Sequence, residues 1–508
     1  MIKTFRLLFI AFFVAASLQA AGAQVRTLAA PCGGEGTMLL YSPAERGFLK
    51  LEKLGPFFRL AWALDGISDS ALFYAPRARR GDDIGIVLGG GTRFYVCGRP
   101  AGASEKTPPL PGEDFWSGNG TLWTRALTAK ELREYSSGRK NGALAVSKDI
   151  TKEKQMDHSL AVYDRSKYML PFWSSDVIYH ETVMFVEGDK TALLMYPAEE
   201  IFEVRSSDLE TLYKEGEDYR LEDGALVLCE NGSLPVMPLS EFYPDPATAL
   251  PGTYFECTVE GHPLLGFSET PKFIEKQIAV TYRPSGRWEG PVPERQPKFD
   301  RFLKKLLSGE PVTVVYYGDS ISTGANSSSV YGRKPNAENW CRMSCSAMED
   351  ISGNGNVTYI NTAVGGMESI WAVDNIEERV TAYDPDLVVY AFGMNDHTKP
   401  AEEFIRLTDL SVSGIREACP ECDVLLVSTM LPHKRARGFW NNQDIYEDAM
   451  KEYVKDKEHV GLAPVTGIHR YLLTRKEYYH ATGNNVNHPN DFLARMYAQT
   501  VIKVIFGR

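Results

Sequence analysis

The sequence predicts an α/β fold with a parallel sheet in the C-terminal part of the chain, preceded by a β-rich, sandwich-like region. In residues 308–508, apolar runs of strand length alternate with segments of helical length, as in parallel sheets covered by helices on both faces. In residues 24–290, short β-branched and aromatic runs are separated by Gly, Pro, Asn and Asp, as in sandwiches and barrels. Residues 283–299 hold four prolines and two glycines, so we expect a linker at 291–307.

The β-rich region shows few helical periods. A polar stretch near residues 140–165 either divides it into two modules or forms one long loop. Examples of its strand-like runs are Ile84–Leu88, Thr92–Val96, Thr182–Val186, Ala192–Tyr196, Ala225–Cys229 and Gln277–Tyr282.

The C-terminal part alternates five apolar runs with five helical segments. The expected strands are Val312–Tyr317, Val357–Asn361, Leu387–Phe392, Val424–Thr429 and Val460–Ala463. The expected helices lie near residues 336–350, 368–383, 400–418, 442–457 and 490–505. Active sites of such sheets lie at the carboxyl ends of the strands, so the residues that follow each strand are the first candidates.

The composition limits the classes of partner. The 508 residues carry a net charge of −11, with 44% hydrophobic and 24% charged residues, which is the balance of a globular protein. An acidic chain is a poor match for nucleic acid or an anionic membrane as its main partner.

The N-terminus has the pattern of a targeting segment. Lys3 and Arg6 precede the apolar run Leu7–Leu18, and Ala21-Gly22-Ala23 is a small-x-small cleavage pattern. We therefore expect residues 1–23 to be a cleaved signal peptide and the protein to be secreted or periplasmic. The apolar run is too short for a stable membrane anchor.

The eight cysteines do not predict a metal site. Cys419 and Cys422 have the spacing of a redox or zinc pair, but no second pair of ligands lies at a suitable distance in the sequence. A local disulfide or two unreactive thiols is the expected state of this pair, and we expect no metal and no organic cofactor.

The chemically useful side chains follow successive strands. Ser320 comes after the first strand in Gly-Asp-Ser, Gly366 follows the second, and Asn395 follows the third in Gly-Met-Asn-Asp. His488 lies in a loop before the last helix. A hydroxyl needs a base to become nucleophilic, and an oxyanion needs N–H donors, so this order of residues fits acyl transfer.

These four blocks resemble those of the SGNH/GDSL hydrolase superfamily over about residues 308–508. The β-rich region that precedes them is similar in arrangement to that of the family's multi-domain carbohydrate esterases. The resemblance implies a three-layer α/β/α domain similar to flavodoxin. It also implies that Ser320 is the nucleophile and His488 the general base. The implied oxyanion hole consists of the Ser320 N–H, the Gly366 N–H and the Asn395 side chain.

The sequence departs from the family pattern in one place. The family usually has Asp three residues before the His, but here the residue is Asn485. An amide orients an imidazole without stabilising its charged form as a carboxylate does. We expect a Ser–His dyad in which Asn485 or a backbone carbonyl orients the ring; the alternatives are Asp491 or a carboxylate from elsewhere in the chain.

Three further residues are candidates for the rim of a substrate site. His397 follows Asn395, and His433 and Trp440 follow the fourth strand. Aromatic faces stack on sugar rings, although each of these side chains is also compatible with simple packing.

The predicted substrate is an O-acylated carbohydrate, most simply acetylated. Predicted export and a β-rich region ahead of the hydrolase domain favour it; the β-rich region either binds glycan or braces the structure. The alternatives are a lipid esterase or lysophospholipase, and a glycan-binding protein whose hydrolase domain is inactive. The loops after the strands carry Asn, Ser, Lys, Arg and Trp instead of long aliphatic stretches, which weighs against a lipid.

Overall fold

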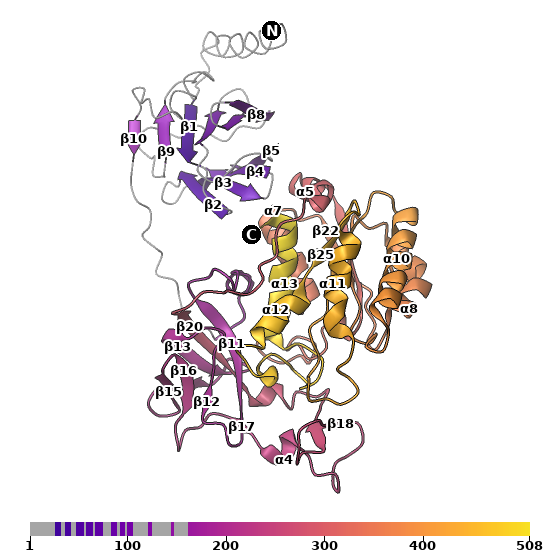
Figure 1. The fold of residues 1–508 in the computed structure, drawn as a ribbon. Coiled ribbons are helices and arrows are strands. Elements are labelled where there is room, and N and C mark those ends of the chain that lie inside the picture. The colour runs from indigo at the N-terminus through magenta and orange to yellow at the C-terminus, as the bar shows by residue number, and fades with distance from the viewer. Residues whose placement is uncertain are drawn as a thin grey trace, which may run out of the picture. The chain divides into compact units, whose positions relative to one another are not determined.

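The computed structural model describes residues 161–507 in full, and before them the backbone of ten strands between Arg26 and Val146. The chain divides into two compact units, residues 1–156 with 506–508 and residues 157–505 (Figure 1). The predicted signal peptide, residues 1–23, lies outside the described residues.

The described strands of the first unit form two antiparallel sheets. One sheet has the order β10-β9-β1-β6-β7-β8, and the other has the order β2-β3-β4-β5. The strands are β1 Arg26–Pro31, β2 Gly36–Tyr41, β3 Gly47–Leu54, β4 Phe57–Leu64, β5 Ile67–Tyr74, β6 Asp83–Leu88, β7 Thr92–Val96, β8 Arg99–Ser104, β9 Gly120–Trp123 and β10 Leu144–Val146.

The second unit begins with a mostly antiparallel sheet of order β14-β13-β20-β11-β17, a three-stranded sheet β12-β16-β15 and the hairpin β18-β19. The β-rich character predicted for the region before residue 290 is thus confirmed. Its strands are β11 Ile178–Val186, β12 Thr191–Ala192, β13 Ala198–Ser206, β14 Leu212–Tyr213, β15 Tyr219–Glu222, β16 Ala225–Leu228, β17 Val236–Met237, β18 Tyr254–Glu256, β19 Leu264–Gly266 and β20 Gln277–Pro284. Its short helices are α3 Arg165–Tyr168, α4 Leu239–Phe242 and η2 Ile274–Lys276.

The rest of the second unit is a five-stranded parallel sheet of order β22-β21-β23-β24-β25, which confirms the predicted α/β class. The strands are β21 Val312–Gly318, β22 Val357–Asn361, β23 Leu387–Ala391, β24 Asp423–Val427 and β25 Val460–Ala463. In the sheet, β21 lies between β22 and β23. The chain therefore places β22 on one side of β21 and the later strands on the other, so the strand order reverses at β21.

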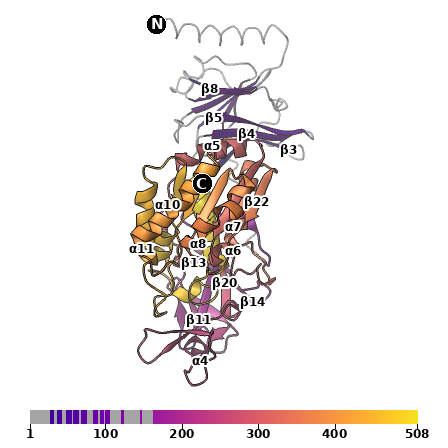
Figure 2. The same cartoon turned by 90° about the vertical axis from the view of Figure 1, so that its right-hand side faces the viewer.

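Helices cover both faces of this sheet, and α7 and α11 lie toward opposite edges of it (Figure 2). The helices are α5 Asp300–Leu307, α6 Ser320–Thr323, α7 Trp340–Ser352, α8 Ser369–Asp374, α9 Ile376–Arg379, α10 Ala401–Ala418, α11 Gln443–Val454, α12 Val465–Leu472 and α13 Asp491–Phe506. Three short 3₁₀ turns are η3 Pro297–Phe299, η4 Thr381–Tyr383 and η5 Tyr478–His480.

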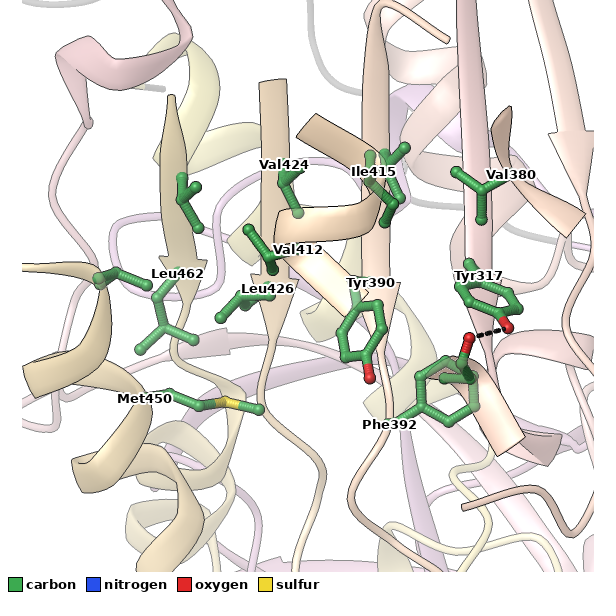
Figure 3. Packing of buried hydrophobic residues seen from close by; sticks show 14 of the residues in the cluster. Tyr317, Val380, Tyr390, Phe392, Val412, Ile415, Val424, Leu426, Met450 and Leu462 are labelled. Atoms are coloured by element: carbon green, nitrogen blue, oxygen red, sulfur yellow. Dashed lines mark hydrogen bonds between the residues drawn. The ribbon is translucent and has the colours of Figure 1, made fainter. Parts of the chain in front are cut away.

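Alternation along the strands divides their side chains between the two faces. Tyr317 and Tyr390 point into a core formed with α8, α10 and α11, where Ile415 and Met450 pack (Figure 3). Tyr316, one position away, packs on the other face against α7, which in turn contacts α13. Both faces of β21 are therefore buried, and β21 leads to the turn that carries Ser320.

The antiparallel sheet packs against the C-terminal part of the α/β structure. The Gln277 side-chain amide donates a hydrogen bond of 2.6 Å to the Thr482 carbonyl, and the buried Lys476 ammonium forms an ion pair with the buried Glu181 carboxylate. Both contacts join β20 or β11 to the segment between α12 and α13, which contains His488. The β-rich part of this unit is therefore attached to the loop that completes the site.

The six described cysteines are unpaired thiols, Cys419 and Cys422 among them. Burial raises the pKa of the Cys422 thiol, which makes it unreactive. In residues 161–507 and the ten earlier strands, no helix has the length and apolar character needed to cross a bilayer.

Candidate active site

The site lies where the order of the parallel strands reverses. In open α/β sheets this reversal opens a crevice at the carboxyl ends of the strands, and ligands bind there. Ser320 begins α6, with one residue between it and the end of β21, and the loops after β22 and β23 carry Gly366 and Asn395.

The turn that presents Ser320 depends on its two preceding residues. A Cβ atom at Gly318 would lie 2.5 Å from the Ala391 carbonyl oxygen, so no side chain fits there. The Asp319 carboxylate accepts a hydrogen bond of 2.9 Å from the Ile321 N–H and caps α6. It also accepts one from the Met394 N–H, and so joins the Ser320 turn to the loop of Asn395.

His488 contacts the Ser320 hydroxyl. The Ser320 Oγ and His488 Nε2 atoms are 2.8 Å apart, and both side chains are more than nine-tenths buried. This is the distance at which an imidazole takes a proton from a serine hydroxyl. The structure thus brings together two residues that lie far apart in the sequence.

Asn326 contacts the other nitrogen of the ring, because its Oδ1 lies 2.6 Å from His488 Nδ1. Its Nδ2 donates a hydrogen bond of 2.6 Å to the Tyr331 hydroxyl, which donates its own proton to the Glu269 carbonyl. The amide therefore turns Oδ1 toward the ring, and Nδ1 must be the donor. Consequently Nε2 carries the lone pair that accepts the Ser320 proton.

A carboxylate from the β-rich part reaches the same ring nitrogen. Glu269, in the loop between β19 and η2, places Oε2 at 3.2 Å from His488 Nδ1. Asn484 donates one hydrogen bond of 3.2 Å to Glu269 Oε1 and another of 2.8 Å to Asn487 Oδ1. Burial acts to raise the pKa of Glu269, but its contacts with His488 and Asn484 outweigh this and hold the pKa below its usual value.

The two residues expected to orient His488 make other contacts. Asn485 donates a hydrogen bond of 2.9 Å to the Gly266 carbonyl, and its Oδ1 has no hydrogen-bond partner among the described residues. Asp491 caps the loop at Ser328, accepting a hydrogen bond of 2.9 Å from its N–H. The ring nitrogen Nδ1 contacts Asn326, Glu269 and, at 3.0 Å, the Asn484 amide in their place, so the expectation for Asn485 and Asp491 is corrected. Their side chains serve neighbouring backbone groups instead.

Of the residues expected to form the oxyanion hole, Gly366 lies in the segment that passes beside Ser320. A Cβ atom on Gly365 would be 3.7 Å from the Ser320 Cβ, so the backbone at 365–366 runs beside the serine. Gly366 has a φ of 78°, a left-handed conformation that favours glycine. The Asn395 side chain donates one hydrogen bond of 3.0 Å to the Met367 carbonyl, which joins the loops after β22 and β23; its role in the oxyanion hole stays a prediction.

The three candidate rim residues lie on the loops after β23 and β24. The His397 ring stacks on Phe439 with centroids 5.2 Å apart. His433 and the half-buried Trp440 line an open cavity of about 760 Å³. His433 itself is buried and stacks on Tyr478, and its burial, with the charge of Arg435 nearby, lowers its pKa to about 3. It is therefore neutral at pH 7 and does not act there as an acid.

No group of three or more His, Cys, Asp or Glu residues that could hold a metal ion occurs within the described ranges. The chemistry available at the site is that of a buried serine, a histidine of fixed tautomer and a set of N–H donors. Together with the parallel sheet, this arrangement is that of an SGNH-type acylhydrolase.

Comparison with known proteins identifies the family. Residues 316–494 match the GDSL-like Lipase/Acylhydrolase family. The predicted resemblance is thereby confirmed. A search of curated proteins found no match.

Several solved structures resemble the chain. One is a two-domain esterase active on acetylated mannans, with 20% identity and a TM-score of 0.34 over 42% of this chain and 54% of that one. The chain thus spans about half the length of that relative. Another is an acetylxylan esterase from Geobacillus stearothermophilus, with 13% identity and a TM-score of 0.32 over 38% and 93% of the two chains. At such identities the likeness concerns the fold and not the substrate.

Asn326 and Glu269 were not identified from the sequence. Asn326 lies in a loop without a recognisable motif, and Glu269 precedes the α/β part altogether. The single available signal was Asn485 itself, because an amide at the usual acid position is compatible with a carboxylate from elsewhere in the chain, which was one of the alternatives. That signal does not say which one.

Proposed function

We propose that the protein is an exported serine esterase that removes O-acyl groups, most simply acetyl, from carbohydrate. The observation that carries the esterase activity is the 2.8 Å contact between Ser320 Oγ and His488 Nε2 at the strand-order reversal. Export rests on the N-terminal pattern of residues 1–23.

The reaction has two halves. His488 accepts the Ser320 proton through Nε2 as Oγ attacks the ester carbonyl, and the oxyanion is stabilised by N–H groups of Ser320, Gly366 and Asn395. His488 then protonates the departing sugar hydroxyl. Water, deprotonated by the same ring, hydrolyses the acyl-enzyme and releases the carboxylic acid.

The carbohydrate assignment is supported by the polar side chains in the loops that follow the parallel strands, which carry Asn, Ser, Lys, Arg and Trp instead of long aliphatic stretches. The loop after β24 carries Lys434, Arg435 and Arg437 beside Trp440, and these side chains line a cavity together with apolar residues such as Leu431 and Leu473. A sugar ring gains from hydrogen bonds to such side chains and from stacking on an aromatic face.

The esterase activity is tested by comparing the native protein with Ser320→Ala on a chromogenic acetyl ester. We expect turnover by the native protein and background turnover by the variant. Ser308→Ala, at an exposed serine on the C-terminal end of α5, is the matched control and should behave as the native protein. Equal background rates for native protein and S320A would refute the proposal.

The substrate class is tested by acetate release from a panel of acetylated polysaccharides, measured beside hydrolysis of long-chain esters. We expect acetate release and weak activity on long chains. A preference for long acyl chains would replace the carbohydrate assignment with a lipid esterase.

A further inference from the structure

We infer that Glu269, supplied by the antiparallel part of the second unit, is the acidic positioning residue of His488 and takes the place of the missing family Asp. This inference rests on the proposed esterase function. It assigns to the β-rich part a direct contribution to the reaction centre, in addition to any bracing or glycan binding.

The first support is the geometry at His488 Nδ1. Glu269 Oε2 and Asn326 Oδ1 lie 3.2 Å and 2.6 Å from this nitrogen, so its proton has an acidic and a neutral acceptor. The amide orients the ring in the resting state. When the ring accepts the Ser320 proton and becomes an imidazolium, the carboxylate stabilises the new positive charge, which an amide does far less well.

The second support is that Glu269 is held in place from both ends. Asn484 donates a hydrogen bond to its carboxylate, and the Tyr331 hydroxyl donates one to its backbone carbonyl. Tyr331 also accepts from Asn326, so one hydroxyl connects the neutral and the acidic partner of the ring. The side chain is half-exposed, and these contacts restrict it to the vicinity of Nδ1.

The third support explains the departure from the family pattern. Asn485 occupies the usual acid position, and its Nδ2 donates to the Gly266 carbonyl, three residues before Glu269. An Asp at 485 would have no proton for this bond and would place a carboxylate against a carbonyl oxygen. The Asn485 amide therefore holds the loop that carries Glu269. The absence of the family Asp at position 485 and the presence of Glu269 beside His488 are thus structurally linked.

The charges around His488 are consistent with this role. Asp319 also acts on the His488 charge, but burial raises its pKa to about 7, so it is partly protonated near neutral pH. Tyr331 stays neutral, since burial and the charge of Glu269 raise its pKa to about 12. Glu269, with a pKa below its usual value, is fully charged at neutral pH and contacts the ring directly.

The test is the pH profile of kcat and KM for the native protein, Glu269→Gln and Glu269→Asp on a chromogenic acetyl ester. A carboxylate this close to a cation shifts a protonation equilibrium by about 1 to 3 pH units, and solvent screening of a half-exposed group favours the lower end. We therefore expect E269Q to lower kcat by roughly ten- to thirtyfold with little change in KM. The acidic limb of its profile should move to lower pH, because the imidazolium has lost its counter-charge, and E269D should restore part of both effects.

The matched control is Glu275→Gln, which changes a similarly exposed glutamate on η2 that pairs with Arg333. It should leave kcat and the pH profile unchanged. Native kinetics in E269Q would overturn the inference. So would a fall in kcat with an unmoved acidic limb and an equal fall in E269D, since that pattern denotes mere support of the loop. An inactive native protein would instead refute the proposed function on which the inference rests.

Discussion

The direction of the Asn326 amide decides which nitrogen of His488 carries a proton. The Tyr331 hydroxyl donates to Glu269 and so accepts from Asn326 Nδ2, which leaves Oδ1 to accept from His488 Nδ1. The neutral ring can then act as a base only through Nε2, the nitrogen that faces Ser320.

Asn326→Ala removes this acceptor, and we expect kcat to fall roughly five- to tenfold with KM unchanged. The expected size follows from the net contribution of one hydrogen bond, about 1 kcal/mol. Asn356→Ala is the control, because Asn356 is an exposed asparagine whose side chain donates to the Gly309 carbonyl, away from the site. An unchanged kcat in N326A would show that the amide does not orient the ring.

Because of Asp319, we expect the free energy of unfolding to fall as the pH rises from about 4 to about 7. Burial raises its pKa to about 7, so the folded chain binds this proton more tightly than the unfolded chain, where the pKa is 3.8. Its unfavourable contribution to the free energy of unfolding grows as pH rises from about 4 and is complete above about 7.

Asp319→Asn should remove this dependence. We expect the free energy of unfolding of the native protein to fall by roughly 2–3 kcal/mol more than that of D319N between pH 5 and pH 8. Denaturant unfolding at both pH values measures the difference. Parallel changes in the two proteins would contradict the assignment.

At the level of elements, the sequence pattern was sufficient to predict the parallel sheet. Each of its five strands overlaps one of the strand-like runs expected from the sequence, and β22 and β25 lie at the expected residues. The expected helix at 368–383 is instead divided into α8, α9 and η4, because the Asn375 side chain donates to the Trp371 carbonyl where α8 ends. Such a side-chain contact leaves no periodic signal in the sequence.

The antiparallel strands were harder to predict. β13 is not among the strand-like runs named from the sequence: its residues Ala198–Ser206 mix charged and apolar side chains, and only two of the nine are buried. The nucleophile and base were predicted from their motifs, whereas Asn326 and Glu269 become partners only through tertiary contacts. Residues that act through the folding of distant loops are the ones that a single sequence conceals.

Trp440, in the loop after β24, leads to a prediction about the binding of polysaccharide. Trp440 is half-buried beside the 760 Å³ cavity, where its ring is available for stacking. Trp440→Ala should raise KM for an acetylated polysaccharide by roughly three- to tenfold, the equivalent of one aromatic contact. The small chromogenic ester is the internal control, and its KM should not change. An unchanged KM for the polysaccharide would remove Trp440 from the substrate rim.

At the scale of the whole second unit, the buried Lys476–Glu181 pair joins the antiparallel sheet to the segment that carries His488. Glu181 also accepts hydrogen bonds of 2.7 Å from the Tyr282 hydroxyl and from the Met195 N–H. Burial lowers the pKa of Lys476, and the Glu181 charge opposes this effect.

Lys476→Met leaves the Glu181 charge without its partner, and we expect a loss of about 3–5 kcal/mol in the free energy of unfolding. Lys214→Met, which breaks an exposed pair with Glu217, should cost less than about 1 kcal/mol. Denaturant titration of the three proteins makes the comparison. Equal stabilities of K476M and K214M would show that the buried pair does not hold the two parts together.

The central claim is that Ser320 is the nucleophile, and covalent labelling tests it most directly. The native protein is treated with a fluorophosphonate, which reacts with serines activated by a base, and the modified peptide is identified by mass spectrometry. We expect one label per chain, on Ser320, and none on His488→Ala. A label on another residue, or an unlabelled Ser320 in a folded protein, would contradict the account.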